Sequence, residues 1–108
     1  MVMELTRDNY DAEIFESKEP VLVDFWGPQC RPCLGLMPVV EEIEKEYNGK
    51  VKFGKVDAST NRMLCAKLRV LGLPAIVFYK DGAEITRLTG DNIGRDDLIA
   101  AVEKVISS

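Results

Sequence analysis

The chain has 108 residues, of which 46% are hydrophobic and 30% are charged, as is typical of a single globular domain, expected here to span residues 1–108. Its net charge of −4 is spread over segments of mixed sign, so no basic patch indicates a nucleic-acid partner. No apolar stretch approaches the length of a membrane span, and the N-terminus lacks the features of a signal peptide, so we expect a cytoplasmic protein.

Strand and helix signals alternate along the chain. The predicted elements are an edge strand over 1–5, a helix to about 17, a strand over 21–26, a helix over 31–47, a strand over 51–57, a short helix over 61–68, strands over 75–79 and 84–89, and a final helix that begins at Asp96 or Asp97. The last two strands are joined by Asp81-Gly82, a strong signal for a two-residue hairpin. A hairpin at the end of an alternating chain predicts a mixed sheet with helices on both faces.

The first predicted helix has its apolar residues at helical spacing. Thr6 or Asp8 can cap its N-terminus. Tyr10, Ile14 and Phe15 are expected on its inner side.

Two cysteines, Cys30 and Cys33, follow the apolar strand 21–26 after a turn at Gly27-Pro28. This arrangement places Cys30 at the predicted N-terminus of the second long helix. Unpaired backbone N–H groups and the helix dipole stabilise a thiolate there, which lowers the pKa of a thiol. The pair therefore indicates a site that alternates between a dithiol and a disulfide.

Other uses of the cysteine pair are less favoured. A structural disulfide that closes so small a loop removes only about 2 kcal/mol of unfolded-state entropy. The chain has no histidine, which excludes Cys-His nucleophile pairs and mixed zinc sites, and one pair cannot fill four zinc positions. A zinc or iron–sulfur half-site shared between two chains stays open, but we expect no metal and no cofactor.

The two sulfurs are expected to have different roles. Cys30 precedes the helix and is the predicted nucleophile, whereas Cys33 lies one turn inside and is the predicted resolving thiol. Asp24 has apolar neighbours in the strand, and burial there would raise its pKa and suit it to exchange a proton with Cys33. Lys55 on the next strand is a candidate partner of Asp24. The alternatives are an acid that reaches solvent and an ordinary solvated lysine.

The chain resembles the thioredoxin family over nearly its whole length. The matching segments are VDFWGPQCRPC, Pro38, FGKVDA, GLPA, the Asp81-Gly82 hairpin and the Thr89-Gly90 end of the last strand. A Cys-x-x-Cys pair alone is a weak signal, but VDFW before it and Gly-Leu-Pro further along make the combination specific.

The resemblance implies the thioredoxin fold, an α/β fold in three layers. Its central five-stranded mixed sheet has the strand order 1-3-2-4-5 and is covered by four helices. The implied activity is protein disulfide reduction through a reversible Cys30–Cys33 disulfide. The implied partners are disulfide-containing target proteins and a thioredoxin reductase as electron donor, and we expect a monomer.

The resemblance also implies a docking surface for targets. Pro74 is expected to be cis and to lie beside the cysteines. Leu73 and Pro74, together with Trp26 and Gly90, are expected to bind an extended target segment. Backbone pairing of this kind reads little side-chain identity, which allows many targets.

The chain departs from the family pattern at the cysteines. The usual segment is Trp-Cys-Gly-Pro-Cys, whereas this chain has Gln29 before Cys30 and Arg31 after it. Gln29 removes a large apolar contact from the docking rim. Arg31 and Pro32 lie between the sulfurs and are expected to tune the potential, with Arg31 raising it by roughly 10–20 mV because its charge favours the thiolate.

Two features leave room for other interpretations. Cys65 is expected to be a small buried hydrophobe, with a regulatory thiol as the alternative. Arg31 prompts the alternative of a disulfide oxidant or isomerase. An apolar rim that includes Leu34, Trp26 and Leu73 would also suit a non-catalytic partner subunit.

Overall fold

The computed structural model describes residues 2–108, in which strands and helices alternate until a final hairpin and helix. In chain order the elements are β1 (Met3–Glu4), α1 (Tyr10–Phe15), β2 (Val21–Trp26), α2 (Arg31–Glu46), β3 (Lys52–Asp57), the 3-10 turn η1 (Ala58–Thr60), α3 (Arg62–Lys67), β4 (Ala75–Lys80), β5 (Ala83–Thr89) and α4 (Arg95–Ile106). The predicted order of strands and helices is therefore confirmed, and η1 is an addition to it. Met1, which the predicted first strand includes, lies outside the described residues.

The five strands form one mixed sheet in the order β1-β3-β2-β4-β5. β1, β3 and β2 run parallel, whereas β4 and β5 are antiparallel to their neighbours. Asp81 and Gly82 join β4 to β5 with φ values of 54° and 81°, as a tight hairpin turn with two left-handed residues requires. The strand order expected from the resemblance is thus confirmed.

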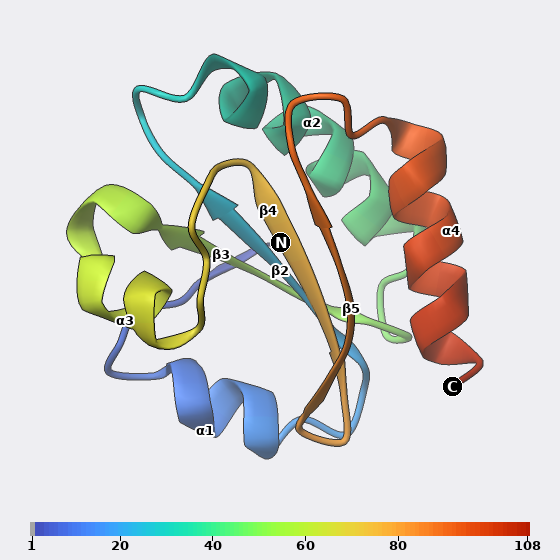
Figure 1. Ribbon diagram of the computed structural model, residues 1–108. Coiled ribbons are helices and arrows are strands. Elements are labelled where there is room, and N and C mark those ends of the chain that lie inside the picture. The colour runs from blue at the N-terminus through green and yellow to red at the C-terminus, as the bar shows by residue number, and fades with distance from the viewer. Residues whose placement is uncertain (1) are drawn as a thin grey trace.

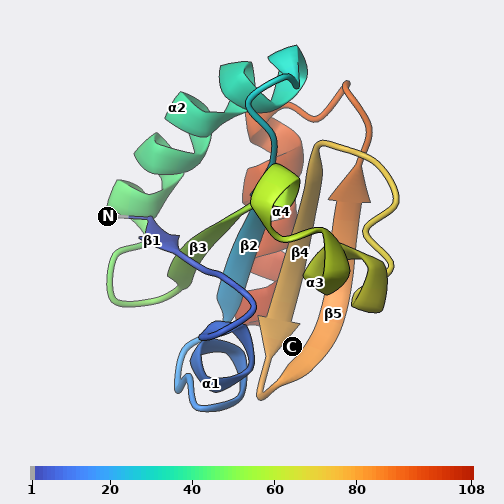
Figure 2. The ribbon, with the colours of Figure 1, turned by 90° about the vertical axis from the view of Figure 1, so that its left-hand side faces the viewer.

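Helices cover both faces of the sheet and complete three layers (Figures 1 and 2). α1 and α3 pack on one face, where their buried residues join a cluster that includes Val23, Phe25 and Val77. α2 and α4 pack on the other face, against a cluster that includes Leu22 and Phe78. Because β2 and β4 contribute residues to both clusters, they are buried on both faces, which explains their nearly continuous apolar sequences.

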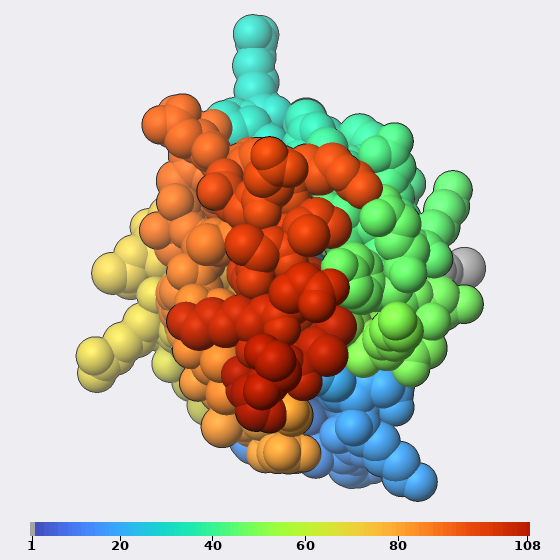
Figure 3. Space-filling view, turned by 90° about the vertical axis from the view of Figure 1, so that its right-hand side faces the viewer, coloured from blue at the N-terminus to red at the C-terminus, as the bar shows by residue number. Residues whose placement is uncertain are grey.

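α2 and α4 lie side by side, as the space-filling view of this side shows (Figure 3). Arg95 at the start of α4 forms ion pairs with Glu46 and, at 3.7 Å, with Glu42 of α2. The Tyr47 hydroxyl donates a hydrogen bond to Glu103. These exposed contacts connect the two helices and hold the C-terminal part of α2 against the body of the protein.

The first helix differs from its prediction in two ways. Its N-cap is Asn9 rather than Thr6 or Asp8, and the Asn9 side chain instead accepts a hydrogen bond from the Thr6 N–H at 2.7 Å. Phe15 was expected inside, but 66% of it is exposed. One residue turns a helix by about 100°, so Ile14 takes the buried position and Phe15 points outward over Gly82.

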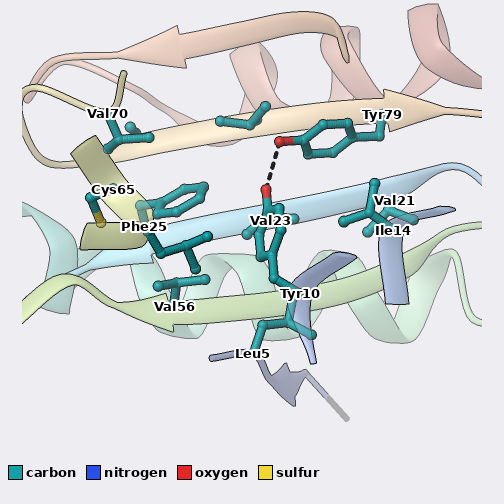
Figure 4. Packing of buried hydrophobic residues seen from close by; sticks show 13 residues of the cluster. Leu5, Tyr10, Ile14, Val21, Val23, Phe25, Val56, Cys65, Val70 and Tyr79 are labelled. Atoms are coloured by element: carbon teal, nitrogen blue, oxygen red, sulfur yellow. Dashed lines mark hydrogen bonds between the residues drawn. The ribbon is translucent and has the colours of Figure 1, made fainter. Parts of the chain in front are cut away.

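A pair of buried tyrosines connects α1 to the sheet (Figure 4). The hydroxyl groups of Tyr10 and Tyr79 lie 2.6 Å apart and share a hydrogen bond. Their rings are 6.2 Å apart in an edge-on arrangement, and Tyr10 also packs near Phe25. Each hydroxyl satisfies the other, which allows both to lie within an apolar cluster.

α4 begins slightly earlier than predicted. It starts at Arg95 with Gly94 as its N-cap, and the Asp97 carboxylate accepts a hydrogen bond from the Gly94 N–H at 2.8 Å. Asp96 and Asp97 thus both lie within the first turn, after the helix has begun at Arg95. Among residues 2–108, no helix combines the length and the apolar character needed to cross a membrane.

Candidate functional site

The predicted redox pair lies where β2 gives way to α2. Cys30 and Cys33 form a disulfide with their Cα atoms 5.2 Å apart. The Cys30 N–H donates to the Gly27 carbonyl at 3.0 Å and closes the turn after β2. Pro32 occupies the first turn of α2, where a missing N–H costs nothing.

The two sulfurs have unequal surroundings. Cys30 is the N-cap of α2 and is half-buried, and its Sγ accepts a hydrogen bond from the Cys33 N–H at 3.3 Å. Cys33 is 0% exposed. Once the disulfide is open, the N–H groups and the dipole of α2 favour a thiolate at Cys30. An incoming group can therefore reach Cys30, whereas Cys33 is shielded.

Asp24 is a buried acid in the middle of β2. It is 2% exposed, and its Oδ1 has no hydrogen-bond partner among residues 2–108. In the sheet it lies opposite Lys55 of β3 and Ile76 of β4. Burial raises the pKa of Asp24 to about 7, although the nearby charge of Lys55 lowers it in part. Asp24 thus changes charge near neutral pH.

The loop before β4 meets the loop that carries the cysteines. The Leu73–Pro74 peptide bond is cis, and the Pro74 carbonyl accepts a hydrogen bond from the Gly90 N–H at 3.2 Å. Gly90 has a φ of 99°, a conformation that favours glycine. The side chain of Leu73 approaches Gly27 so closely that a Cβ there would lie 3.2 Å from it. The cis bond expected from the resemblance is present.

Two hollows flank Leu73. One, of about 500 Å³, includes Gln29, Cys30 and Cys65, and lies between the β2–α2 loop and α3. The other, of about 510 Å³, includes Gly90 and lies between the α3–β4 loop and the end of β5. Leu73 borders both of them. Trp26, the remaining residue of the expected docking surface, is half-buried at the end of β2.

The first hollow includes residues that the sequence did not single out. Ala58, Ser59 and Ala66 line it from η1 and α3. No spacing pattern connects these residues with Cys30, because only the packing of α3 brings them together. Asn61 was also missed; it is buried and donates to the Asp57 carbonyl at 3.0 Å, which holds the start of α3 beside the end of β3.

Cys65 is a buried free thiol, as predicted. Burial raises its pKa, which keeps it in the less reactive thiol form. It nevertheless borders the first hollow. Among residues 2–108, no three side chains of the His, Cys, Asp or Glu types are grouped in a way that could hold a metal ion.

Comparison with known proteins identifies relatives that cover nearly the whole chain. The model of the Thioredoxin family matches residues 1–104. A thioredoxin from Acetoanaerobium sticklandii is 42% identical over 105 residues, which are 97% of this chain and 100% of the relative. A thioredoxin from Peptoclostridium acidaminophilum is 38% identical over 104 residues, 96% of this chain and 94% of the relative.

A third relative is larger. The bifunctional thioredoxin reductase/thioredoxin of Mycobacterium leprae is 32% identical over 90 residues, which are 83% of this chain but only 20% of the relative. The family match, the two full-length relatives and the disulfide at the start of α2 all lead to one conclusion. This chain belongs to the thioredoxin family.

Proposed function

We propose that in this thioredoxin-type protein disulfide reductase Cys30 is the attacking thiol and Cys33 the resolving thiol. The unequal burial of the two sulfurs carries the assignment, because only Cys30 is open to a protein substrate. Arg31 and Pro32, which lie between the two cysteines, are proposed to adjust the reduction potential of the pair. Arg31 acts through its charge and Pro32 through its fixed backbone.

The reaction is a pair of thiol–disulfide exchanges. The Cys30 thiolate attacks one sulfur of a target disulfide, and the other target sulfur leaves as a thiolate that takes up a proton. The Cys33 thiolate then attacks the Cys30 sulfur and releases the second target thiolate. Two electrons pass to the target, and the Cys30–Cys33 disulfide remains.

Asp24 is the proposed proton acceptor for Cys33. Its burial supports this role, and so does the lack of a hydrogen-bond partner for its Oδ1 among residues 2–108. A buried carboxylate without a partner is destabilised, so its protonation is favourable. A pKa of about 7 suits a group that both accepts and returns protons near neutral pH. Lys55 is its proposed electrostatic partner, and a target segment is proposed to dock along Trp26, Leu73, Pro74 and Gly90.

Reduction of insulin disulfides tests the assignment of the two thiols. We expect Cys30→Ser to abolish reduction and Cys33→Ser to accumulate mixed disulfides with targets. Cys65→Ser is the matched control, because it removes a thiol outside the pair and is expected to keep the activity. Activity of Cys30→Ser equal to that of the wild type would refute the proposal.

The role of Asp24 requires a measurement that separates the two exchange steps. We expect Asp24→Asn to slow release of the mixed disulfide more than its formation, with the difference greatest above pH 7. Stopped-flow tryptophan fluorescence can follow both steps through Trp26, the only tryptophan of the chain. Equal slowing of the two steps would remove Asp24 from the proton transfer.

Two alternative functions have specific support. The exposed Leu34 beside the site suits a non-catalytic partner subunit, which would keep its complex after both Cys30 and Cys33 are changed to serine. The charge of Arg31 suits a disulfide oxidant or isomerase. A reduction potential close to that of thioredoxin, about −270 mV, would count against the oxidant.

The remaining assignments concern the setting of the reaction. We propose a thioredoxin reductase as the electron donor, supported by the Mycobacterium leprae relative whose name joins the two activities. We further propose a monomer of one domain over residues 1–108, in a reducing compartment such as the cytoplasm, where the free thiol of Cys65 stays reduced. Light scattering and reductase-coupled turnover test the oligomeric state and the donor.

A further inference from the structure

α3 ends in a turn that has arginine at the position where glycine is usual. The Val70 N–H donates to the Cys65 carbonyl at 2.8 Å, and the Arg69 N–H donates to the Ala66 carbonyl at 3.1 Å, as in the Schellman motif that ends many helices. Arg69 occupies the left-handed position of this motif, with a φ of 59°. That conformation crowds the Cβ of any residue except glycine, so contacts from elsewhere must stabilise the turn.

One side chain of β5 supplies these contacts. Arg87 donates hydrogen bonds to the carbonyls of Leu68 and Arg69, each at 3.1 Å. A helix end leaves such carbonyls without a partner inside the helix. Glu84 accepts two hydrogen bonds from the same guanidinium, at 2.7 and 2.8 Å. All three nitrogen atoms of Arg87 are thus engaged, and the planar group is held in one geometry.

The end of β5 holds the segment 69–74, which finishes in the cis proline, at both of its ends (Figure 2). Arg87 binds the carbonyl of its first residue, and the Gly90 N–H donates to the carbonyl of its last residue. Between these points Val70 packs in the core, but Leu71 is 91% exposed. The path of the chain towards the proline therefore depends on the turn that Arg87 fixes.

We propose that Arg87 is a positioning residue for target docking. Its guanidinium fixes the left-handed turn at Arg69 and thereby places the backbone groups of Leu73 and Pro74. The inference rests on the proposed docking of a target along those two residues, and it adds a side chain that acts on the target through the backbone. Because Arg87 also lines the second hollow, a direct contact with the target is the alternative that the test must separate.

The first arm of the test separates docking from thiol chemistry. Reduced protein is mixed with excess insulin, and its oxidation is followed through the fluorescence of Trp26 at rising insulin concentrations. We expect Arg87→Gln to raise the half-saturating insulin concentration at least about fivefold, the equivalent of one backbone hydrogen bond to the target, and to leave the limiting rate unchanged. Alkylation of Cys30 by iodoacetamide needs no docking and should keep its wild-type rate.

The second arm separates positioning from a direct contact. Glycine adopts the left-handed conformation without strain, so Arg69→Gly should keep the turn in place when the guanidinium of Arg87 is absent. We expect Arg87→Gln combined with Arg69→Gly to regain a half-saturating insulin concentration close to that of the wild type. Arg69→Gln is the matched control, because it removes the same charge but not the crowding, and it should restore nothing.

Two further variants complete the set. Arg95→Gln also breaks ion pairs of an arginine, those with Glu42 and Glu46, and is expected to bind insulin as the wild type does. Arg87→Lys keeps the charge, but an ammonium group cannot reach Glu84 and both carbonyls at once. It should also raise the half-saturating concentration, and it replaces Arg87→Gln in both arms if that variant does not fold.

Three results would overturn the positioning role. The first is an unchanged half-saturating concentration in the folded Arg87 variants. The second is an increase that Arg69→Gly does not reverse, since the loss of a direct contact would behave in that way. The third is alkylation of Cys30 slowed by the same factor, which would assign the loss to the thiol. Failure of the wild-type protein to reduce insulin would instead refute the proposed function.

Discussion

The buried carboxyl of Asp24 should make the stability of this protein depend on pH. In the unfolded chain the group ionises at its ordinary pKa of 3.8, whereas burial raises the pKa to about 7 in the folded protein. Well below pH 3.8 the carboxyl is protonated in both states and contributes nothing. As pH rises from 4 to 7, only the unfolded state loses the proton, so ionisation of this group progressively destabilises the fold.

The structure sets the size of this effect. Because one pKa unit corresponds to about 1.4 kcal/mol, the difference between 3.8 and about 7 corresponds to about 4 kcal/mol, reached above pH 7. Asp24→Asn removes the charge and keeps the shape. We therefore expect the variant to gain up to about 4 kcal/mol over the wild type at pH 8.5 and little at pH 4, with part of the gain offset because the amide is also buried.

Urea unfolding of the oxidised proteins at several pH values between 4 and 8.5 measures this difference. Asp8→Asn is the matched control, because the Asp8 side chain is 90% exposed. At each pH we expect this variant to have nearly the same free energy of unfolding as the wild type. A gain from Asp24→Asn that is equal at pH 4 and pH 8.5 would show that ionisation of Asp24 is not its cause.

Three further substitutions test other parts of the structure. Arg31→Gln should lower the reduction potential by roughly 10–20 mV, because it removes a charge that favours the thiolate. Arg31→Lys keeps the charge and should leave the potential unchanged. Equilibration with glutathione measures the potential of both variants. Tyr10→Phe should lower the free energy of unfolding in urea by about 1–3 kcal/mol, because it leaves the buried Tyr79 hydroxyl without its partner. If changing both Tyr10 and Tyr79 to phenylalanine costs more than the two single changes added together, this explanation is contradicted. Gly54→Ala should cost about 1–3 kcal/mol, since the new Cβ would lie 2.5 Å from Leu5; unchanged stability would mean that Leu5 can move aside.

The fold could be predicted in advance, and the candidate site residues proposed, because their signals are local. Val21–Trp26 is apolar without interruption, and Asp81-Gly82 defines a hairpin within two residues. Phe15 was placed wrongly because apolar spacing alone did not decide which of two adjacent positions faces the sheet. In the structure Ile14 occupies the core and Phe15 covers Gly82, a contact between segments far apart in the chain.

The surroundings of the cysteines were only partly predictable. Cys30, Cys33 and Asp24 follow one another closely in the sequence, and their order along β2 and α2 is enough to suggest their chemistry. The cis bond at Pro74 came only from the resemblance to the thioredoxin family, since most bonds before proline are trans. The hollow lined by Ala58 and Ala66 had no signal at all.

The sequence by itself determined which residues can carry redox chemistry and which elements hold them, because an apolar strand, a helix start and a Cys-x-x-Cys pair depend on neighbouring residues. Only the tertiary structure decided how much each sulfur is exposed, that Oδ1 of Asp24 has no hydrogen-bond partner among residues 2–108, and that α3 leaves a hollow beside Cys30. Burial, desolvation and empty space are properties of packed surfaces. They arise where segments distant in the chain meet, and no local pattern records them.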